Sequence, residues 1–320
     1  MMQFYKKRDF GTFISDSLSF FKLYGKNYFK NYILLNGLLM ILLVVVCIFG
    51  YKELFMQAFG SNTSGESYYF EKYFEDNLGM LFVVGILTFL LFLLLMIVNY
   101  LYPVFYLRRL AQGQEKIKMD DILSDFKNNA KRIVFLCLGM VFIVTPLAMI
   151  VIGITSALIF IIIGIFLLLL VLPTLFNVVT FLMYDYFNSS RGFFESLSYS
   201  IRSQFSYANG RERSPYWKYW GAAIIIYIIL YVITTVFTYV PMVFFYGSMF
   251  TTPHSGNFEQ NPFNGAFGVA IFFIYGISML VSFFLSNILY VNAGLMYYDS
   301  RTDLHQKVEL AEIETIGINE

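Results

Sequence analysis

The chain has 320 residues, of which 58% are hydrophobic and only 13% are charged. This composition excludes an ordinary soluble globular domain. The formal net charge of +1 provides no general attraction for nucleic acid or for an acidic partner, so we expect no nucleic-acid binding. The composition therefore indicates an integral membrane protein.

A long uncharged stretch sets the expected architecture. The residues from Ile133 to Tyr184 include no Asp, Glu, Lys or Arg. At about 1.5 Å per helical residue, this length crosses a hydrocarbon core of about 30 Å twice. It predicts a hairpin of two spans with its turn at Gly153–Ser156. The same criterion predicts a segment 1–31, six spans and a tail 293–320, with the spans at about 32–50, 80–101, 133–152, 157–182, 220–240 and 266–292.

The basic residues are unevenly distributed between the connections. All of the 22 Lys and Arg residues except Lys52 and Lys72 precede the first span, join the second to the third or the fourth to the fifth, or follow the sixth. Connections rich in Lys and Arg stay on the cytoplasmic side. We therefore expect a multi-pass protein of the cytoplasmic (inner) membrane with both termini in the cytoplasm.

Short related sequences recur around these spans. Before each odd-numbered span, apolar residues at helical spacing accompany DSLS at 16–19, DILS at 121–124 and ESLS at 195–198. They predict amphipathic helices at the cytoplasmic interface. The even-numbered spans end in NYLYP at 99–103, LMYDY at 182–186 and LMYYD at 295–299, whose rings we expect in the headgroup layer. The predicted fold is an all-α polytopic membrane protein, with six transmembrane helices in three pseudo-repeated hairpins, each preceded by an interfacial helix.

The C-terminal sequence carries a family resemblance. LMYYDSR at 295–301, followed by a polar amphipathic tail, resembles the ending of a broad group of bacterial six-span membrane proteins. That group includes the membrane domain fused to some glycerophosphodiester phosphodiesterases and uncharacterised stand-alone relatives. The acid-x-Leu-Ser stretches and Tyr-rich exits are similar to the same group, although Ser300 stands where an apolar residue is commoner. These 320 residues include no phosphodiesterase domain, so the resemblance implies an inner-membrane fold and no catalytic activity.

The distribution of titratable residues disfavours catalysis. None of the predicted spans contains a charged residue, which counts against coupled transport through a buried carboxylate and against intramembrane hydrolysis. His254 and His305 are expected on opposite sides of the membrane, where they cannot share a metal ion. We therefore expect no enzyme activity, no cofactor and no metal site.

Polar side chains within the spans form two candidate sets. Asn99, Asn177 and Asn292 occupy matching places in the three units, as a polar patch for the headgroup of an amphiphile. The simpler interpretation is hydrogen bonding between helices, worth about 0.6 kcal/mol per bond. The second set consists of serines four residues apart on the sixth span, which favour close helix packing over a pore: Ser278, Ser282 and Ser286.

Two further sets lie outside the spans. Basic residues near the cytoplasmic surface are candidate contacts with anionic lipid headgroups: Arg108, Arg109, Lys131, Arg132, Arg211, Arg213 and Lys218. The outer loop expected at 241–265 has no basic residue and carries candidate contacts with a partner: Phe244, Phe245, Phe250 and Phe258. Its simpler alternative is to lie on the membrane surface.

Two functional hypotheses follow. The first is a non-catalytic scaffold or accessory subunit of a larger membrane complex, with membrane lipids and another membrane protein as partners. The second is a facilitator or exporter of lipids or small amphiphiles that uses the Asn patch in the inner-leaflet half of the bundle. The proline breaks at Pro146 and Pro173 favour this second hypothesis.

Overall fold

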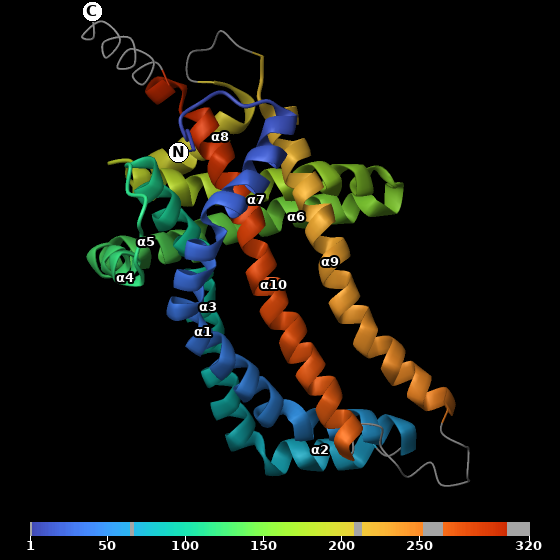
Figure 1. Ribbon diagram of the computed structural model, residues 1–320. Helices are drawn as coiled ribbons and strands as arrows, with labels where there is room; N and C mark the ends of the chain where they lie inside the picture. The colour runs from blue at the N-terminus through green and yellow to red at the C-terminus, as the bar shows by residue number, and fades with distance from the viewer. Residues whose placement is uncertain (1, 65–66, 208–212, 252–264, 306–320) are drawn as a thin grey trace, which may run out of the picture. The chain divides into compact units, whose positions relative to one another are not determined.

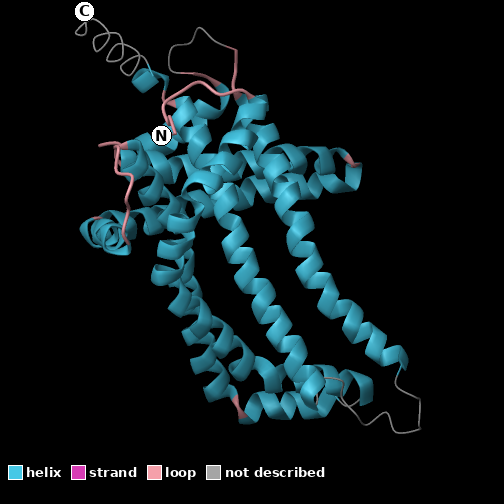
Figure 2. Ribbon diagram, viewed as in Figure 1, coloured by secondary structure: helices cyan, strands magenta, loops and turns pink. Residues whose placement is uncertain are grey.

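The computed structural model describes all residues except 1, 65–66, 208–212, 252–264 and 306–320. These described residues form helices and loops, with no strand among them (Figure 2). They include six helical stretches long and apolar enough to cross a membrane: Phe10–Leu54, Leu78–Ala111, Ala130–Ile161, Ile163–Asn188, Tyr216–Val240 and Phe272–Ser300. The expected all-helical, multi-pass membrane protein is confirmed at this level.

The helices follow the chain in the order that Figure 1 shows. They are α1 (Phe10–Ser64), α2 (Ser67–Asp76), α3 (Leu78–Ala111), α4 (Met119–Asn128), α5 (Ala130–Gly139), α6 (Thr145–Ala157), α7 (Ile163–Asn188), α8 (Phe193–Phe205), α9 (Tyr216–Thr251) and α10 (Gly265–Ser300). A π-helical turn, Met140–Val144, joins α5 to α6, and a short 3-10 helix, Leu158–Ile161, follows α6.

The chain divides into two compact units. Unit 1 comprises Met1–Leu35, Tyr100–Ile228 and Asn287–Glu320, and unit 2 comprises Asn36–Asn99 and Ile229–Ser286. The divisions fall within α1, α3, α9 and α10. Each unit is described separately below.

Several described helices extend beyond the predicted spans. The segment expected as an interfacial helix at the N-terminus is continuous with the first span in α1, which runs from Phe10 to Ser64. Likewise, α3 continues through Pro103 to Ala111 rather than ending near residue 101. The outer loop expected at 241–265 is shorter, since α9 extends to Thr251.

The turn of the α6–α7 hairpin in unit 1 also differs from the prediction. Helix α6 runs through Gly153–Ser156 to Ala157, and the Thr155 hydroxyl shares its proton between the Val151 and Ile152 carbonyls of the same helix, both at 2.9 Å. The chain turns at Ile162, whose φ of 66° lies in the left-handed region. Gly164 makes the turn compact, since a Cβ there would lie 2.3 Å from the Ile159 nitrogen. The glycine that the hairpin turn requires is therefore Gly164, not Gly153.

A proline in α7 helps to position the start of α9. Pro173 has no N–H, so the carbonyl of Leu169 lacks its usual partner within the helix. Trp220 Nε1 donates to that carbonyl at 3.1 Å. One turn away, the Thr174 and Tyr216 hydroxyls are 3.1 Å apart. The proline thus provides a docking point for α9 within unit 1.

Helix α8 packs in unit 1 with its polar face inward. Its buried residues are Ser196, Ser200, Ser203 and Gln204, whereas Phe194 is 68% exposed. Small side chains allow the backbones of α8 and α7 to approach closely, as they do between membrane helices. The exposed apolar side chains of α8 are Phe194, Ile201 and Phe205.

In unit 2, helices α1, α2 and α3 line an open apolar pocket of about 480 Å³, whose side chains include Tyr51, Leu81 and Phe89. Helix α10 approaches α1 closely at Gly276, where a Cβ would lie 2.7 Å from Val44 Cγ1. Apolar contacts of this kind hold unit 2 together.

Candidate functional site

Two carboxylates are buried near the ends of helices in unit 1. Asp185 in α7 and Asp299 in α10 are both 0% exposed. The predicted spans stopped short of both residues, because a charged side chain ordinarily marks the end of a span. The structure continues α7 to Asn188 and α10 to Ser300. These acids and their partners are the strongest candidate site in unit 1, and sequence reasoning missed them.

Asp299 lies at the centre of the first cluster. Its Oδ2 accepts hydrogen bonds from Lys218 Nζ at 2.7 Å and from the Tyr219 hydroxyl at 2.6 Å. Its Oδ1 accepts from the Arg8 backbone N–H at 2.6 Å. The carboxylate therefore joins the first turn of α9 and the N-terminal segment to the last turn of α10.

Arg8 organises the N-terminal segment beside that carboxylate. Its buried guanidinium donates to the Phe4 and Gln3 carbonyls, both at 2.7 Å, and to Asp16 Oδ2 at 2.9 Å. Burial lowers the pKa of Arg8 from its usual value, and the hydrogen bond to Asp16 opposes that shift. The segment is further held by Phe4, whose ring packs edge-on against Tyr298 at 5.3 Å.

Asp185 lies at the centre of the second cluster. Its Oδ1 accepts from Arg191 Nη1 at 2.9 Å and from the Tyr297 hydroxyl at 3.4 Å, and Arg301 Nη1 lies 3.6 Å away. Arg301 also forms a bidentate ion pair with Asp303, in which both N···O distances are 3.0 Å. Burial lowers the pKa of Arg301, but its hydrogen bonds to Asp303, the charge of Asp303 and the nearby Tyr297 and Tyr199 hydroxyls together outweigh that effect and raise it.

These clusters are arranged to hold helices together. Each buried carboxylate is paired with at least one cation, which offsets the large cost of removing a charge from water. Tyrosine hydroxyls and the Arg8 backbone N–H donate further hydrogen bonds to the carboxylates, and backbone carbonyls accept from the Arg8 guanidinium. Among the described residues, no group of three or more His, Cys, Asp or Glu side chains is placed to hold a metal ion. The ion pairs and hydrogen bonds of the clusters connect the ends of α7, α9 and α10 to their neighbours.

Tyrosines form a buried network next to the clusters. Tyr102 donates to the Tyr28 carbonyl at 2.6 Å, and Tyr28 donates to Asn287 Oδ1 at 2.6 Å. Tyr184 donates to the Tyr290 carbonyl at 3.1 Å. Because a hydroxyl that finds an internal partner no longer needs water, these rings pack inside unit 1.

The three asparagines of the predicted polar patch are all buried but differ in their partners. In unit 2, Asn99 Nδ2 donates to Ser286 Oγ at 3.3 Å. In unit 1, Asn292 Oδ1 accepts from Ser17 Oγ at 3.0 Å, while its Nδ2 has no partner among the described residues. Neither amide atom of Asn177 has one there either, so no hydrogen bond joins Asn177 to Asn292.

The serines of the predicted packing face differ in burial. Ser278 is buried, whereas Ser282 is exposed and donates to the Ser278 carbonyl within α10. Ser286 accepts from Asn99, as described above. The close approach of α10 in unit 2 is at Gly276.

The predicted basic contacts also divide into two groups. Three make internal contacts: Arg109 with Asp125 at 2.5 Å, Arg132 with the Tyr186 carbonyl, and Lys218 with Asp299. Lys131 and Arg213 are exposed, and Arg108 is half-buried. Contact of these side chains with lipid stays a prediction.

Some predicted residues have no described side chain. Arg211 and Phe258 lie outside the described residues, and Phe244, Phe245 and Phe250 belong to α9 with undescribed side chains.

Comparison of the chain with protein-family models, curated proteins and solved structures finds no match.

Proposed function

We propose that the protein is a non-catalytic scaffold or accessory subunit of a larger membrane complex. The observation that carries this proposal is the exposure of α9 in unit 2. Between Ile229 and Val240, Leu230 is the one buried residue. A helix that packs in a bundle buries a continuous stripe of side chains along one face. This part of α9 therefore offers most of its surface to lipid or to another helix.

The polar side chains on this part of α9 favour a protein helix over lipid alone. Thr234 and Thr238 are one turn apart, and their hydroxyls donate within the helix to the Leu230 and Thr234 carbonyls. Small hydroxyl residues at this spacing allow helix backbones to approach closely in membranes. The paired clusters of unit 1 support the same role, because they stabilise a fixed frame.

A photo-cross-linking amino acid at Thr238 tests the scaffold proposal. We expect one protein adduct from intact membranes, in stoichiometric amount after purification in mild detergent. The matched control places the same amino acid at Phe142, which is 72% exposed in unit 1 and should form lipid adducts only. Lipid adducts alone at both positions, together with a monomeric purified protein, would contradict the proposal.

We also propose the expected topology, with both termini in the cytoplasm and the protein in the inner membrane. The uneven distribution of Lys and Arg supports it. In a background without Cys47 and Cys137, an impermeant thiol reagent on intact cells should label a cysteine at Ile162 and spare one at Lys118. The reverse pattern would contradict this orientation. The threefold hairpin repeat and the resemblance to phosphodiesterase membrane domains stay predictions.

Facilitated movement of lipids or small amphiphiles is the second candidate function. Asn177 favours it, because both amide atoms are buried without a partner among the described residues. A buried amide without a hydrogen-bond partner is energetically costly, and transient binding of a polar headgroup would satisfy it. In vesicles, the protein should accelerate exchange of a fluorescent phospholipid between leaflets, and Asn177→Leu should abolish that acceleration. Equal rates with and without protein would exclude this function.

A further inference from the structure

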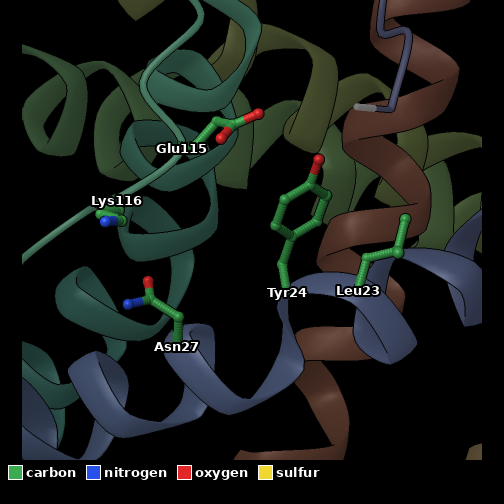
Figure 3. Close-up of a pocket in the computed structure, with 5 residues that line it drawn as sticks. All are labelled: Leu23, Tyr24, Asn27, Glu115 and Lys116. Atoms are coloured by element: carbon green, nitrogen blue, oxygen red, sulfur yellow. The ribbon is translucent and has the colours of Figure 1, made fainter.

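A polar cavity of unit 1 lies between α1 and the loop that joins α3 to α4. Its volume is about 400 Å³, and it is lined by Leu23, Tyr24, Asn27, Glu115 and Lys116 (Figure 3). This volume lies in the range of small-ligand pockets. Its lining combines an acid, a base, a hydroxyl, an amide and one apolar side chain, which indicates a ligand with several polar groups.

The contacts of Asn27 and Tyr24 make both side chains hydrogen-bond donors toward a ligand. Asn27 Oδ1 accepts from the Tyr106 hydroxyl at 2.8 Å and from Asn31 Nδ2 at 3.1 Å. Both lone pairs of that oxygen are thus engaged, and the amino group of Asn27 is left to donate. The Tyr24 hydroxyl accepts from the Met2 backbone N–H at 3.2 Å, which leaves its own proton to donate.

The two charged residues of the cavity are unused by the fold. Neither Glu115 nor Lys116 forms an ion pair among the described residues, with each other or with a neighbour. The next acids along the chain differ, since Asp121 and Asp125 lie 3.9 and 2.5 Å from Arg109 nitrogens. The cavity therefore offers one free cation and one free anion to a ligand.

The position of the cavity along α1 corresponds to the depth of lipid headgroups. The uncharged apolar run of α1 begins at Tyr32, and Asn27 precedes it by five residues, or about 8 Å of helix. That distance places the cavity in the interfacial layer outside the hydrocarbon core. Leu23, which is 64% exposed, supplies an apolar surface beside the polar groups.

We propose that this cavity binds the headgroup of a zwitterionic phospholipid that carries a primary amine, as in phosphoethanolamine. The phosphate accepts hydrogen bonds from Asn27, Tyr24 and Lys116, and the ammonium donates to Glu115. A choline headgroup has no N–H to donate, and a glycerol headgroup has no cation for Glu115. The site therefore selects an amine headgroup, and this selection is independent of the scaffold role.

Native mass spectrometry of the full chain in detergent tests the proposal. The probes are dioleoyl phosphatidylethanolamine, the matching phosphatidylcholine and phosphatidylglycerol, and water-soluble glycerophosphoethanolamine. We expect about tenfold tighter binding of the phosphatidylethanolamine than of the other two lipids, as for one charged hydrogen bond. Equal binding of all three lipids would overturn the proposal. Equally tight binding of glycerophosphoethanolamine would overturn the assignment to a lipid.

Variants separate the contribution of each side chain. Lys116→Gln should weaken binding of the phosphatidylethanolamine about tenfold, while Lys118→Gln, two residues away, should not change it. Glu115→Gln should remove the preference for amine over choline. Asn27→Asp keeps an oxygen acceptor for Tyr106 and Asn31 but loses the donor, so it should weaken binding without changing the melting temperature. Wild-type binding in Lys116→Gln and Glu115→Gln would overturn the proposal.

Discussion

Units 1 and 2 bury different kinds of side chain. In unit 1, Arg8, Asp185 and Asp299 are buried and paired, and buried tyrosines bridge helices through their hydroxyls. The buried apolar side chains that are described in unit 2 are almost all aliphatic: Met40, Leu43, Ile48, Leu81, Leu95, Leu230 and Phe283. Asn36 there has no partner among the described residues for either amide atom.

The difference shows two ways of stabilising membrane helices. Aliphatic contacts give little preference for a protein neighbour, because lipid tails are equally apolar. Directional hydrogen bonds and ion pairs fix specific partners instead. We therefore expect substitutions at the clusters of unit 1 to cost more stability than comparable substitutions in unit 2.

The largest effect is expected for Asp299→Asn. It leaves Lys218 without its counterion in a largely buried site, and the free energy of unfolding should fall by about 3–5 kcal/mol. Thermal unfolding of the purified protein in detergent measures the loss. Glu75→Gln, on the exposed side of α2 in unit 2, should change it by less than about 0.5 kcal/mol. Adding Lys218→Met to Asp299→Asn should restore part of the stability, and a purely additive loss would contradict the pairing.

A pair of glycine substitutions tests packing in the two units. A Cβ at Gly294 in unit 1 would lie 2.5 Å from the Tyr184 hydroxyl oxygen, so Gly294→Ala should cost about 1–3 kcal/mol. At Gly79 in unit 2, a Cβ meets nothing within 4 Å. Gly79→Ala should therefore stabilise α3 by up to about 0.5–1 kcal/mol. Melting temperatures that shift in the same direction would contradict the comparison.

A smaller gain is expected at the hairpin turn of unit 1, which lies outside the clusters. Ile162 adopts a φ of 66°, which a β-branched side chain rarely tolerates. Ile162→Asn should relieve about 1 kcal/mol of strain, because Asn accepts the left-handed region more readily. Ile161→Asn serves as the control, and a gain of the same size there would show that polarity rather than backbone strain is responsible.

The smallest effect concerns pH. Burial raises the pKa of Asp303, but the hydrogen bonds from Arg301, its positive charge, a backbone hydrogen bond and the charge of Arg191 together lower that pKa below its ordinary value. The pair therefore stabilises the fold above the usual carboxyl pKa of about 3.9, and this contribution disappears as pH falls through the lower folded pKa. Because Asp303 is half exposed, the contribution should stay below about 1 kcal/mol.

Melting curves between pH 6 and pH 3 provide the measurement for Asp303. The variant Asp303→Asn should melt earlier than the wild type near neutral pH, and the difference should shrink as the pH is lowered. In unit 2, Glu75→Gln should leave the pH profile of the wild type unchanged. A difference between Asp303→Asn and the wild type that grows toward low pH would contradict the assigned direction of the pKa shift.

The sequence predicted the six spans but not what joins them. Apolar length is a local property, so six membrane helices followed directly from hydrophobic runs. The hairpin turn was placed at Gly153–Ser156, whereas the close backbone approach that requires a glycine is at Gly164. The partners of Asp299 could not be predicted, since Arg8 and Lys218 are far away in the sequence. The charged residues Asp299 and Arg301 in LMYYDSR could have indicated a buried ion pair, but the prediction placed them in the cytoplasmic tail.

The bond between the Arg8 backbone and Asp299 has a consequence for biosynthesis. Its two ends are 291 residues apart, so at translation rates of about 5–20 residues per second they are made roughly 15 to 60 s apart. During that interval the backbone N–H of Arg8 lacks its carboxylate partner, because the nascent chain does not yet contain its final helix. Insertion of α10 therefore completes the first cluster. A ribosome that stalls before α10 would leave an inserted protein in which Arg8 and Lys218 lack their bonds to Asp299.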